Sequence, residues 1–298
     1  MPSWSELSQF LVSGLALGGV YALSGVGLVV LYRATGVLYL AFGAVGAMGA
    51  FLTFEMIQAS APGWTAWVVC ILFGGVCTLI YGMLFGPPLA RRDPLVKAVA
   101  TLGLTLVLFG AMNLLWPPTG GAVRSITLPT DNGGFTVAGL NVTWTQLIAL
   151  VAGIVLTVGT ALFLRHTKLG TAMRAMANDR EITATLGVPV RRVEAAAWFG
   201  CGILAGIAGL LLADLVQLDP TTLTFLVISS LAAALIARLR SIAVTFVAAI
   251  VIGVVHDLLT PFTALTNYRD LTPFVFAVIA LLWVSRHRTV MTRSREEA

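Results

Sequence analysis

Long apolar stretches, separated by short polar connections, run along almost the whole chain. An α-helix rises 1.5 Å per residue, so about 20 apolar residues cross the roughly 30 Å of hydrocarbon in a bilayer. Nine stretches of about this length are nearly free of charged residues, and we expect each to be a membrane-spanning helix. They cover residues 10–31, 36–54, 64–85, 98–116, 143–164, 195–216, 221–237, 241–259 and 271–285.

The pattern predicts an all-α fold: one polytopic bundle of about nine transmembrane helices (eight to ten), formed by residues 1–298 as a single domain. The composition agrees, because 58% of the residues are hydrophobic and 10% are charged, whereas soluble domains have about 25% charged residues. A soluble globule would need more polar surface than these side chains supply. The last stretch is the shortest, and Tyr268 and Trp283 are placed to anchor its two interfaces.

The basic residues fall almost entirely in alternate connections. Nine spans place 16 of the 18 Lys and Arg residues on one side, and leave Arg124 and Arg269 on the other. Cytoplasmic loops of membrane proteins are enriched in Lys and Arg. The N-terminus is therefore predicted outside and the C-terminus in the cytoplasm. This placement explains the net charge of +5, so the charge gives no reason to expect nucleic acid as a partner.

Sequence signatures of catalysis are missing. The chain has no G-x-x-x-x-G-K-[ST] loop for ATP, no H-E-x-x-H and no G-x-S-x-G. Its three cysteines lie inside apolar stretches without the spacing of a metal site or disulfide. We therefore expect neither an enzyme nor a bound metal or cofactor. Ionisable residues are also missing from the middle of the spans, where ion-coupled transporters place them, so any driving energy is expected to come from another protein.

Small residues recur at helical spacing within the spans. Gly14 and Gly18 form one such pair, Gly202 and Gly206 form another, and residues 43–50 hold a series of glycines and alanines. Small residues allow two helix backbones to approach closely in a membrane. We interpret them first as packing positions, and a path lined by glycine backbone is the alternative.

The longest cytoplasmic connection, residues 165–193, has a helical pattern of its own. Leu169, Met173 and Met176 recur at helical spacing in its first half. After them, Asn178 is expected to cap a second helix, with Glu181 reaching back as in a capping box. The loop is therefore predicted to hold two short helices joined at residues 177–179.

The second helix has clear stop signals. Gly187 suits the position just after a helix, and Pro189 prevents the helix from continuing. Ile182 and Leu186 share one face and need a partner to bury them. A short surface helix that is connected to two spans can transmit a displacement, caused by a soluble protein, to the membrane-spanning helices. The alternative is a solvated loop that only satisfies the charge rule; the stop signals and the apolar stripe favour the helix pair.

Several segments of the chain are similar to a known family. GLALGGVYALSGVGLVVLYRATGVLYLAFGAVGAMGAF (residues 14–51), TLGLTLVLFG (101–110) and the loop RHTKLGTAMRAMANDREITATLGVPVRRV followed by GILAGIAGLL (202–211) resemble the permease subunits of branched-chain amino-acid ABC transporters. Such a permease lies in the bacterial plasma (inner) membrane. The resemblance implies two cytoplasmic ATPase subunits, a second permease that is a different chain, and an extracytoplasmic substrate-binding protein.

In the family, the loop matching residues 165–193 docks the ATPase subunit. Carried over by motif, the ATPase-docking residues are Gly170, Arg174, Ala175, Asp179, Ala184 and Gly187. The outer loop 117–142, which is rich in turn signals, is expected to meet the binding protein.

This sequence departs from the family pattern in two places. Where the family has Asn, His and Glu in an N-F-A-H-G-E-like stretch, this chain has Tyr39, Phe42 and Ala44. The glycine-rich turn of a late inner loop is replaced within residues 229–244. Without these polar side chains, the resemblance does not restrict the substrate to leucine, isoleucine and valine. Urea, amides and related small solutes are the alternative substrates.

A few polar residues inside the spans are candidates for the translocation path, with two aromatic residues as its wall. For each polar residue the alternative is helix packing or a helix–helix hydrogen bond. The candidates are Thr101, Thr105, Asn113, Ser229 and Ser230, with Tyr39 and Phe42 as the wall.

The sequence thus predicts the membrane-spanning subunit of a binding-protein-dependent ABC importer. The alternative from another class is a stand-alone secondary transporter or channel for a small polar solute. The absence of ionisable residues at mid-span and the patterned cytoplasmic loop argue against that alternative.

Overall fold

The computed structural model describes residues 4–90, 92–117, 124–126, 134–137, 140–225, 227–262, 271–279 and 282. Residues 272–279 are helical. The other helices, in chain order, are α1 (Trp4–Thr35), α2 (Phe42–Gln58), α3 (Gly63–Leu89), α4 (Pro94–Leu115), α5 (Trp144–His166), α6 (Lys168–Asn178), α7 (Arg180–Thr185), α8 (Val190–Leu215), α9 (Pro220–Phe225), α10 (Val227–Ile236) and α11 (Ile242–Leu258).

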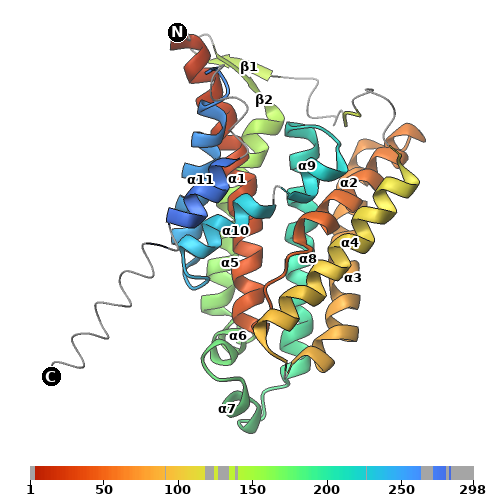
Figure 1. Cartoon of the computed structure of the whole chain (residues 1–298), viewed down its shortest axis with the longest axis vertical. Helices are drawn as coiled ribbons and strands as arrows, with labels where there is room; N and C mark the ends of the chain where they lie inside the picture. The colour runs from red at the N-terminus through yellow and green to blue at the C-terminus, as the bar shows by residue number, and fades with distance from the viewer. Residues whose placement is uncertain are drawn as a thin grey trace, which may run out of the picture.

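The predicted helical membrane bundle is confirmed (Figure 1). Among the described residues, α1, α3, α4, α5 and α8 are long and apolar enough to cross a bilayer. The helix α2, the α9–α10 pair and α11 are apolar but shorter. Each lies in a predicted apolar stretch, while the ninth stretch, 271–285, extends beyond the described residues. The number of spans and their orientation stay predictions.

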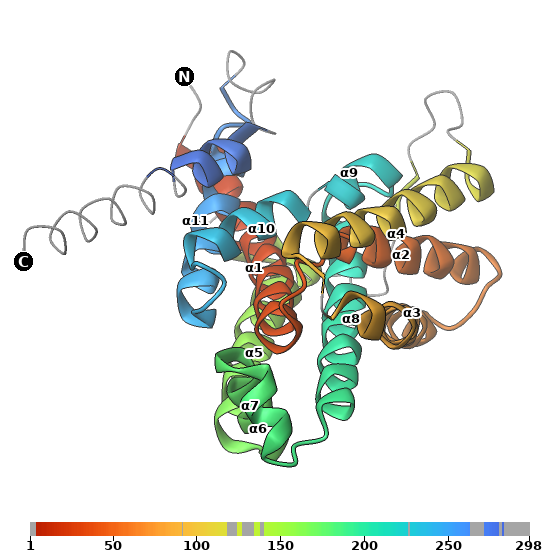
Figure 2. The ribbon, with the colours of Figure 1, turned by 60° about the horizontal axis from the view of Figure 1, so that its bottom comes forward.

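Helix α1 is the centre of the bundle. It packs against α5, α8, α10 and α11, and Figure 2 shows these helices gathered around it. In its most apolar window 89% of the residues are buried, against 17% for α4 and 22% for α5. The apolar outer faces of α4 and α5 are therefore available to lipid, and α1 is the core.

Glycine contacts bring the central helices together, as their spacing predicts. A Cβ atom on Gly18 would lie 2.8 Å from the Cα of Ile250 on α11. A Cβ atom on Gly209 of α8 would overlap the backbone of Gly46 on α2. Helices can approach this closely only where one side chain is missing, so these glycines set the spacing of α1 from α11 and of α2 from α8.

The helix predicted over residues 36–54 begins only at Phe42, which corrects the sequence prediction. Residues 36–39 form neither helix nor strand, and residues 40 and 41 form a turn. Gly36 has a φ of +68°, a conformation that ends α1 and that glycine adopts without strain. The chain then runs through the interior of the protein before α2 starts.

A small β-hairpin lies in the predicted outer loop 117–142. Its strands, β1 (Gly134–Val137) and β2 (Leu140–Thr143), are antiparallel, with Gly134 opposite Thr143. The hairpin lies at one end of the molecule, and α6 and α7 lie at the other (Figure 1). Most of the remaining loop falls outside the described residues.

Candidate functional site

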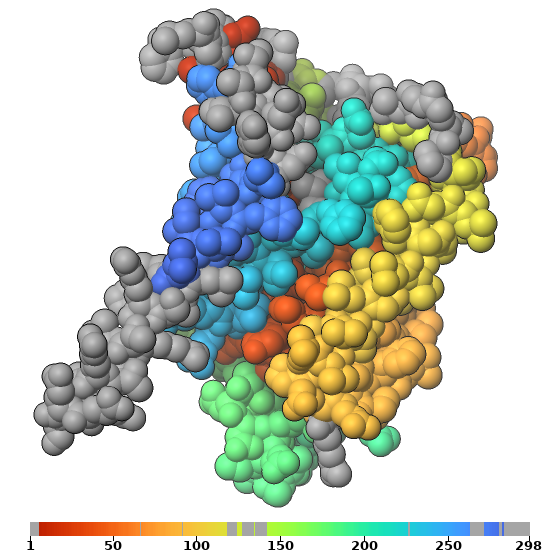
Figure 3. All heavy atoms as spheres, viewed as in Figure 1, coloured from red at the N-terminus to blue at the C-terminus, as the bar shows by residue number. Residues whose placement is uncertain are grey.

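The connection at residues 165–193, predicted to be cytoplasmic, forms the helix pair that its sequence predicts. The first helix is α6 and the second is α7, and they are joined at Asp179. The pair projects beyond the ends of the long helices, where the space-filling view shows it as a separate green knob (Figure 3). The loop thus forms a defined surface at one end of the bundle.

Helix α6 is anchored to the bundle by its apolar face. Met173 and Met176 are 3% and 5% exposed. Thr167 caps the start of α6, accepting a hydrogen bond from the N–H of Gly170 at 2.9 Å. A Cβ atom on Gly170 would overlap the backbone of Phe163 and Leu164 in α5. Gly170 therefore contributes to the packing of α6 on α5.

The cap of α7 is Asp179, not Asn178, which is the last residue of α6. The Asp179 carboxylate accepts hydrogen bonds from the N–H groups of Glu181 and Ile182, both at 2.9 Å. Aspartate and asparagine are about equally good caps, so residue type alone could not decide between these neighbours. With the cap one residue later, Glu181 is in the second helical position and the predicted capping box does not form.

The far end of α7 matches the sequence prediction. Gly187 has a φ of +81°, and its N–H donates to the carbonyl oxygen of Ala184 at 3.1 Å. Pro189 immediately precedes α8. An ion pair between Arg180 and Glu194, 2.8 Å apart, fastens α7 to α8. The first residue of α7 is thus fastened to α8, and Gly187 and Pro189 end the helix.

Helix α7 presents apolar side chains to the surroundings of the protein. Ile182 is 59% exposed and Leu186 is 78% exposed. Leu169, which the sequence places on the stripe of α6, is 40% exposed, while the two methionines of that stripe are buried. Exposed apolar patches mark sites of contact with another protein or with a membrane surface.

The remaining predicted docking residues lie on or beside this surface. Arg174 is exposed, and its guanidinium donates to the carbonyl oxygen of Arg165 at 3.4 Å. Ala184 is exposed and Ala175 is half-buried. The helix pair therefore exposes a charged side chain, Arg174, as well as the apolar side chains of Ile182 and Leu186.

A small cavity lies inside the bundle, among α1, α2, α8, α9 and α10. Its volume of about 20 Å³ has room for roughly one water molecule. The wall includes Tyr21, Ser24, Phe42 and Ser230, together with the backbone of glycines from α2 and α8, and none of its lining residues is charged. The wall is therefore mainly apolar, with a few neutral hydroxyl groups.

The structure places two of the predicted path residues at this cavity. Phe42 and Ser230 line it, and both are almost fully buried. Ser229 is 1% exposed on the same helix as Ser230 but is not part of the wall. Asn113 donates to the carbonyl oxygen of Phe109, within its own helix.

The other three predicted path residues are Tyr39, which lies within residues 36–41, and Thr101 and Thr105 of α4. Tyr39 packs edge-on against Trp198, with ring centroids 5.3 Å apart. The Thr101 hydroxyl contacts the backbone of Leu38 and Leu40. Thr105 donates to the carbonyl oxygen of Thr101 at 3.2 Å. The seven candidates therefore do not form one site.

Sequence reasoning missed part of the cavity wall. Tyr21 and Ser24 of α1 line it, as do Gly43, Gly46 and Gly209. The glycines carried a signal, but close helix packing accounted for them equally well. Ser24 is a small polar residue within the first apolar stretch, and its hydroxyl donates to the carbonyl oxygen of Val20, which is how such residues are commonly accommodated in membrane helices.

Comparison with known proteins assigns the chain to a family. Residues 10–284 match the family described as "Branched-chain amino acid transport system / permease component". The high-affinity branched-chain amino acid transport system permease protein LivH of Salmonella typhimurium is 23% identical, with 92% of each chain covered. BraD of Pseudomonas aeruginosa, which has the same descriptive name, is 25% identical, with 95% of each covered. The fructose import permease protein FruG of Bifidobacterium longum is 21% identical over 59% of this chain and 51% of that protein.

A solved structure shares the fold. The structure of PsaBC from Streptococcus pneumoniae in complex with Fab contains a chain that matches with a TM-score of 0.54 and 13% identity, covering 93% of this chain and 91% of that one. At this identity the likeness concerns the fold alone. Since the family match extends over nearly the whole chain, this protein belongs to the family of branched-chain amino acid transport system permease components.

Proposed function

We propose that this chain is the membrane-spanning subunit of an ABC importer, in which two cytoplasmic ATPase subunits dock on the α6–α7 pair. The observation that carries the proposal is the exposed apolar side chains of Ile182 and Leu186, at 59% and 78% exposure, on a short helix that an ion pair fastens to α8. The sequence itself has no ATP-binding loop, so the energy source has to be another subunit.

The other subunits of the proposed importer have the remaining tasks. A different permease chain completes the membrane part, and a substrate-binding protein delivers solute to the outer face near the hairpin. The solute class is that of the family, branched-chain amino acids, named for LivH and BraD.

The stand-alone transporter or channel is the competing function. Reconstitution into liposomes separates the two. We expect ATP-dependent uptake of leucine only when the chain is combined with its cognate ATPase pair, partner permease and binding protein. Omitting either the ATPases or ATP should reduce uptake to the level of empty liposomes. Uptake by this chain alone, without ATP, would refute the proposal and favour the secondary transporter.

We further propose that the bundle lies in the bacterial plasma membrane with α6 and α7 in the cytoplasm. A cysteine introduced at Thr185 should react with a membrane-impermeant maleimide only from the cytoplasmic side. A cysteine at Ala59, in the exposed turn after α2, should react only from outside. Both are placed in a background without Cys70, Cys77 and Cys201, and labelling of both from the same side contradicts the orientation.

A further inference from the structure

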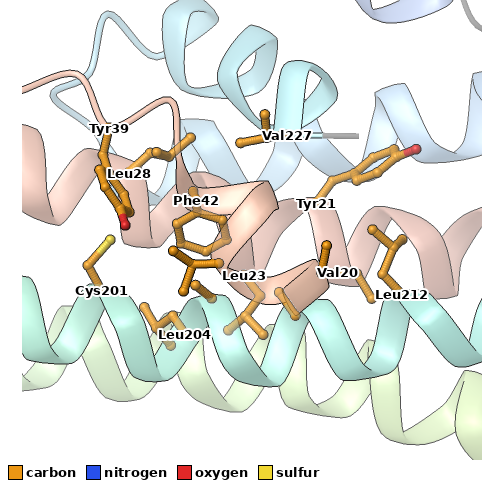
Figure 4. Close-up of a cluster of buried hydrophobic side chains, with 14 of the residues drawn as sticks. Val20, Tyr21, Leu23, Leu28, Tyr39, Phe42, Cys201, Leu204, Leu212 and Val227 are labelled. Carbon is orange, nitrogen blue, oxygen red and sulfur yellow. The ribbon is translucent and has the colours of Figure 1, made fainter. Parts of the chain in front are cut away.

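A large groove lies on the outside of the bundle, between α11 and the helix of residues 272–279. Its volume is about 550 Å³. The interior is filled by comparison: the close-up shows the ring of Phe42 beside Leu23 of α1 and Leu204 of α8 (Figure 4), and the cavity that Phe42 lines has a volume of about 20 Å³. The groove therefore has room for a ligand that this interior cavity excludes.

Apolar side chains alone line the groove in the part of the chain that the structure describes. Val244, Val247 and Val251 recur at helical spacing on one face of α11 and are 46%, 61% and 45% exposed. From the first to the last of these valines, the face extends roughly 10 Å along the helix axis. Both helices of the groove lie within predicted spans, so its occupant is expected to be a lipid chain or another transmembrane helix.

Two arginines mark one end of the groove. Ile236 and Ala243 line that end, and the turn of residues 237–241 connects them. Within this turn, Arg238 and Arg240 are both exposed. Since the chain has no Asp or Glu from residue 227 to residue 256, the turn and the groove face of α11 carry positive charge only. A pocket that is apolar along its length and basic at its end is complementary to an anionic phospholipid.

The turn lies at the end of the bundle that we propose to be cytoplasmic. The guanidinium of Arg33, in the last turn of α1, donates to the carbonyl oxygen of Arg240 at 3.3 Å. Helix α1 packs against α6, and Figure 1 shows α6 at the same end of α1. The cytoplasmic leaflet is the one whose anionic lipids attract basic residues next to a span.

The backbone of the turn is unusual for an arginine. The N–H groups of Arg238 and Leu239 donate to the carbonyl oxygens of Leu235 and Ala234, both at 2.8 Å. These two bonds form a Schellman motif, which ends α10 and favours glycine at the position that Arg238 occupies. Arg238 has a φ of +54° and Leu239 a φ of +55°, a left-handed conformation that is strained for any residue with a Cβ atom. Glycine would relieve this strain, so the charge of Arg238 is present at the expense of stability.

Contacts on both sides fix the position of the turn. Leu239 is 9% exposed and packs with Val29 and Ala234, while Arg33 holds the next carbonyl group. The backbone that carries the two arginines is therefore already ordered. Binding to a preformed support loses less conformational entropy than binding to a flexible loop.

We propose that the groove binds an anionic phospholipid of the cytoplasmic leaflet. Arg238 and Arg240 bind the phosphate, and an acyl chain lies along α11 from Val244 to Val251. A second transmembrane helix could also cover the valines, but only an occupant with a negative group at this level uses the arginines. The site is additional to the proposed transport function and needs neither the solute nor an ATPase.

Native mass spectrometry of the purified full-length chain in detergent tests the proposal. Titration with palmitoyl-oleoyl-phosphatidylglycerol should show one lipid bound more tightly than all others. Phosphatidylcholine with the same acyl chains should show no such site. Glycerol phosphate, which has the phosphate without the chains, should not displace the lipid at equal concentration. Equal affinities for the two lipids, or displacement by glycerol phosphate, overturn the proposal.

Arg238→Gly separates the charge from the backbone. The affinity for phosphatidylglycerol should fall about fivefold, the effect of one basic residue near anionic lipid. The thermal midpoint without added lipid should rise, because the left-handed strain is relieved. Arg238→Lys keeps the charge and should bind nearly as the parent does. Arg192→Gln removes an exposed charge at the start of α8 and should not change the affinity; a decrease as large as that of Arg238→Gly overturns the site.

Val247→Trp tests the place of the acyl chain. The indole fills the groove, and the tight phosphatidylglycerol site should be lost. Val158→Trp, at a residue 51% exposed on α5, should keep the site. Equal binding by the two variants refutes the groove as the lipid site. The same spectra count protein chains: pairs of chains that Val247→Trp separates, without tight lipid binding by the parent, would assign the groove to a second copy and refute the proposal.

Discussion

Replacing Ile182 and Leu186 together by aspartate is expected to abolish ATPase binding and ATP-driven uptake while the chain still inserts in the membrane. The two side chains are exposed, so their loss removes no internal packing. If a partner buries them, each contributes about 1.5–3 kcal/mol to the complex, and a carboxylate in their place would have to be desolvated. The combined loss corresponds to a decrease in affinity of at least about 100-fold.

The measurement is co-purification of the ATPase subunits with the permease from detergent, followed by uptake in liposomes. Ala59→Asp adds the same charge to an exposed residue in the turn between α2 and α3, and ATPase co-purification should be unaffected. Normal ATPase recovery with the double variant would show that α7 is not the docking surface. Loss of recovery with Ala59→Asp as well would point to a general effect of charge on assembly.

Gly209→Leu is expected to destabilise the bundle more than any other single change considered above. A Cβ atom alone would overlap the backbone of Gly46. The overlapping atoms belong to the main chain of a helix, so no side-chain rotation can relieve the clash. Overpacking of a core by side-chain atoms typically costs about 1–3 kcal/mol, and here the obstacle is main chain, so we expect about 3 kcal/mol or more. Helices α2 and α8 would have to separate, which also deforms the cavity.

The thermal midpoint of the purified chain in detergent measures this effect, together with the yield of inserted protein. Gly200→Leu is the matched control, because it lies on the same helix and a Cβ atom there meets nothing within 4 Å. It should be neutral or slightly stabilising, since glycine is a poor helix former in water-soluble helices. Equal midpoints for Gly209→Leu and Gly200→Leu would contradict the close packing of α2 on α8.

The sequence predicted the α6–α7 helix pair well because its signals are local. Gly187 and Pro189 end and separate helices through their own backbone chemistry, and the structure shows Gly187 with positive φ. The start of α7 was predicted one residue too early. Asn178 and Asp179 are both good caps. The residue at which α7 begins depends on tertiary contacts on both sides of the junction, namely the burial of Met176 and the Arg180–Glu194 ion pair.

The candidate path was less predictable, because an apolar pattern does not distinguish a buried helix from another buried segment. Tyr39 and Ala41 belong to a continuous apolar stretch, yet they lie in the non-helical segment of residues 36–41. A hydrogen bond joins this segment, at Leu40, to Thr101, 61 residues away in sequence. Sequence reasoning selected Thr101 as polar in a span, but its partner is a backbone that only the fold brings close.

The sequence by itself determined that this is a helical membrane protein, the approximate position of its helices and the presence of a short helix pair within residues 165–193. Hydropathy and helix stop signals act over a few residues, so the tertiary fold is not needed to recognise them. The tertiary structure decided where the second span is helical, which glycines meet and which residues surround the cavity. Those features arise from contacts between distant segments: Gly209 against Gly46, Phe42 between α1 and α8, and Thr101 against the backbone of residues 36–41. The sequence does not show which atoms lie opposite a backbone N–H group or a glycine, so the role of either can be assigned only from the tertiary structure.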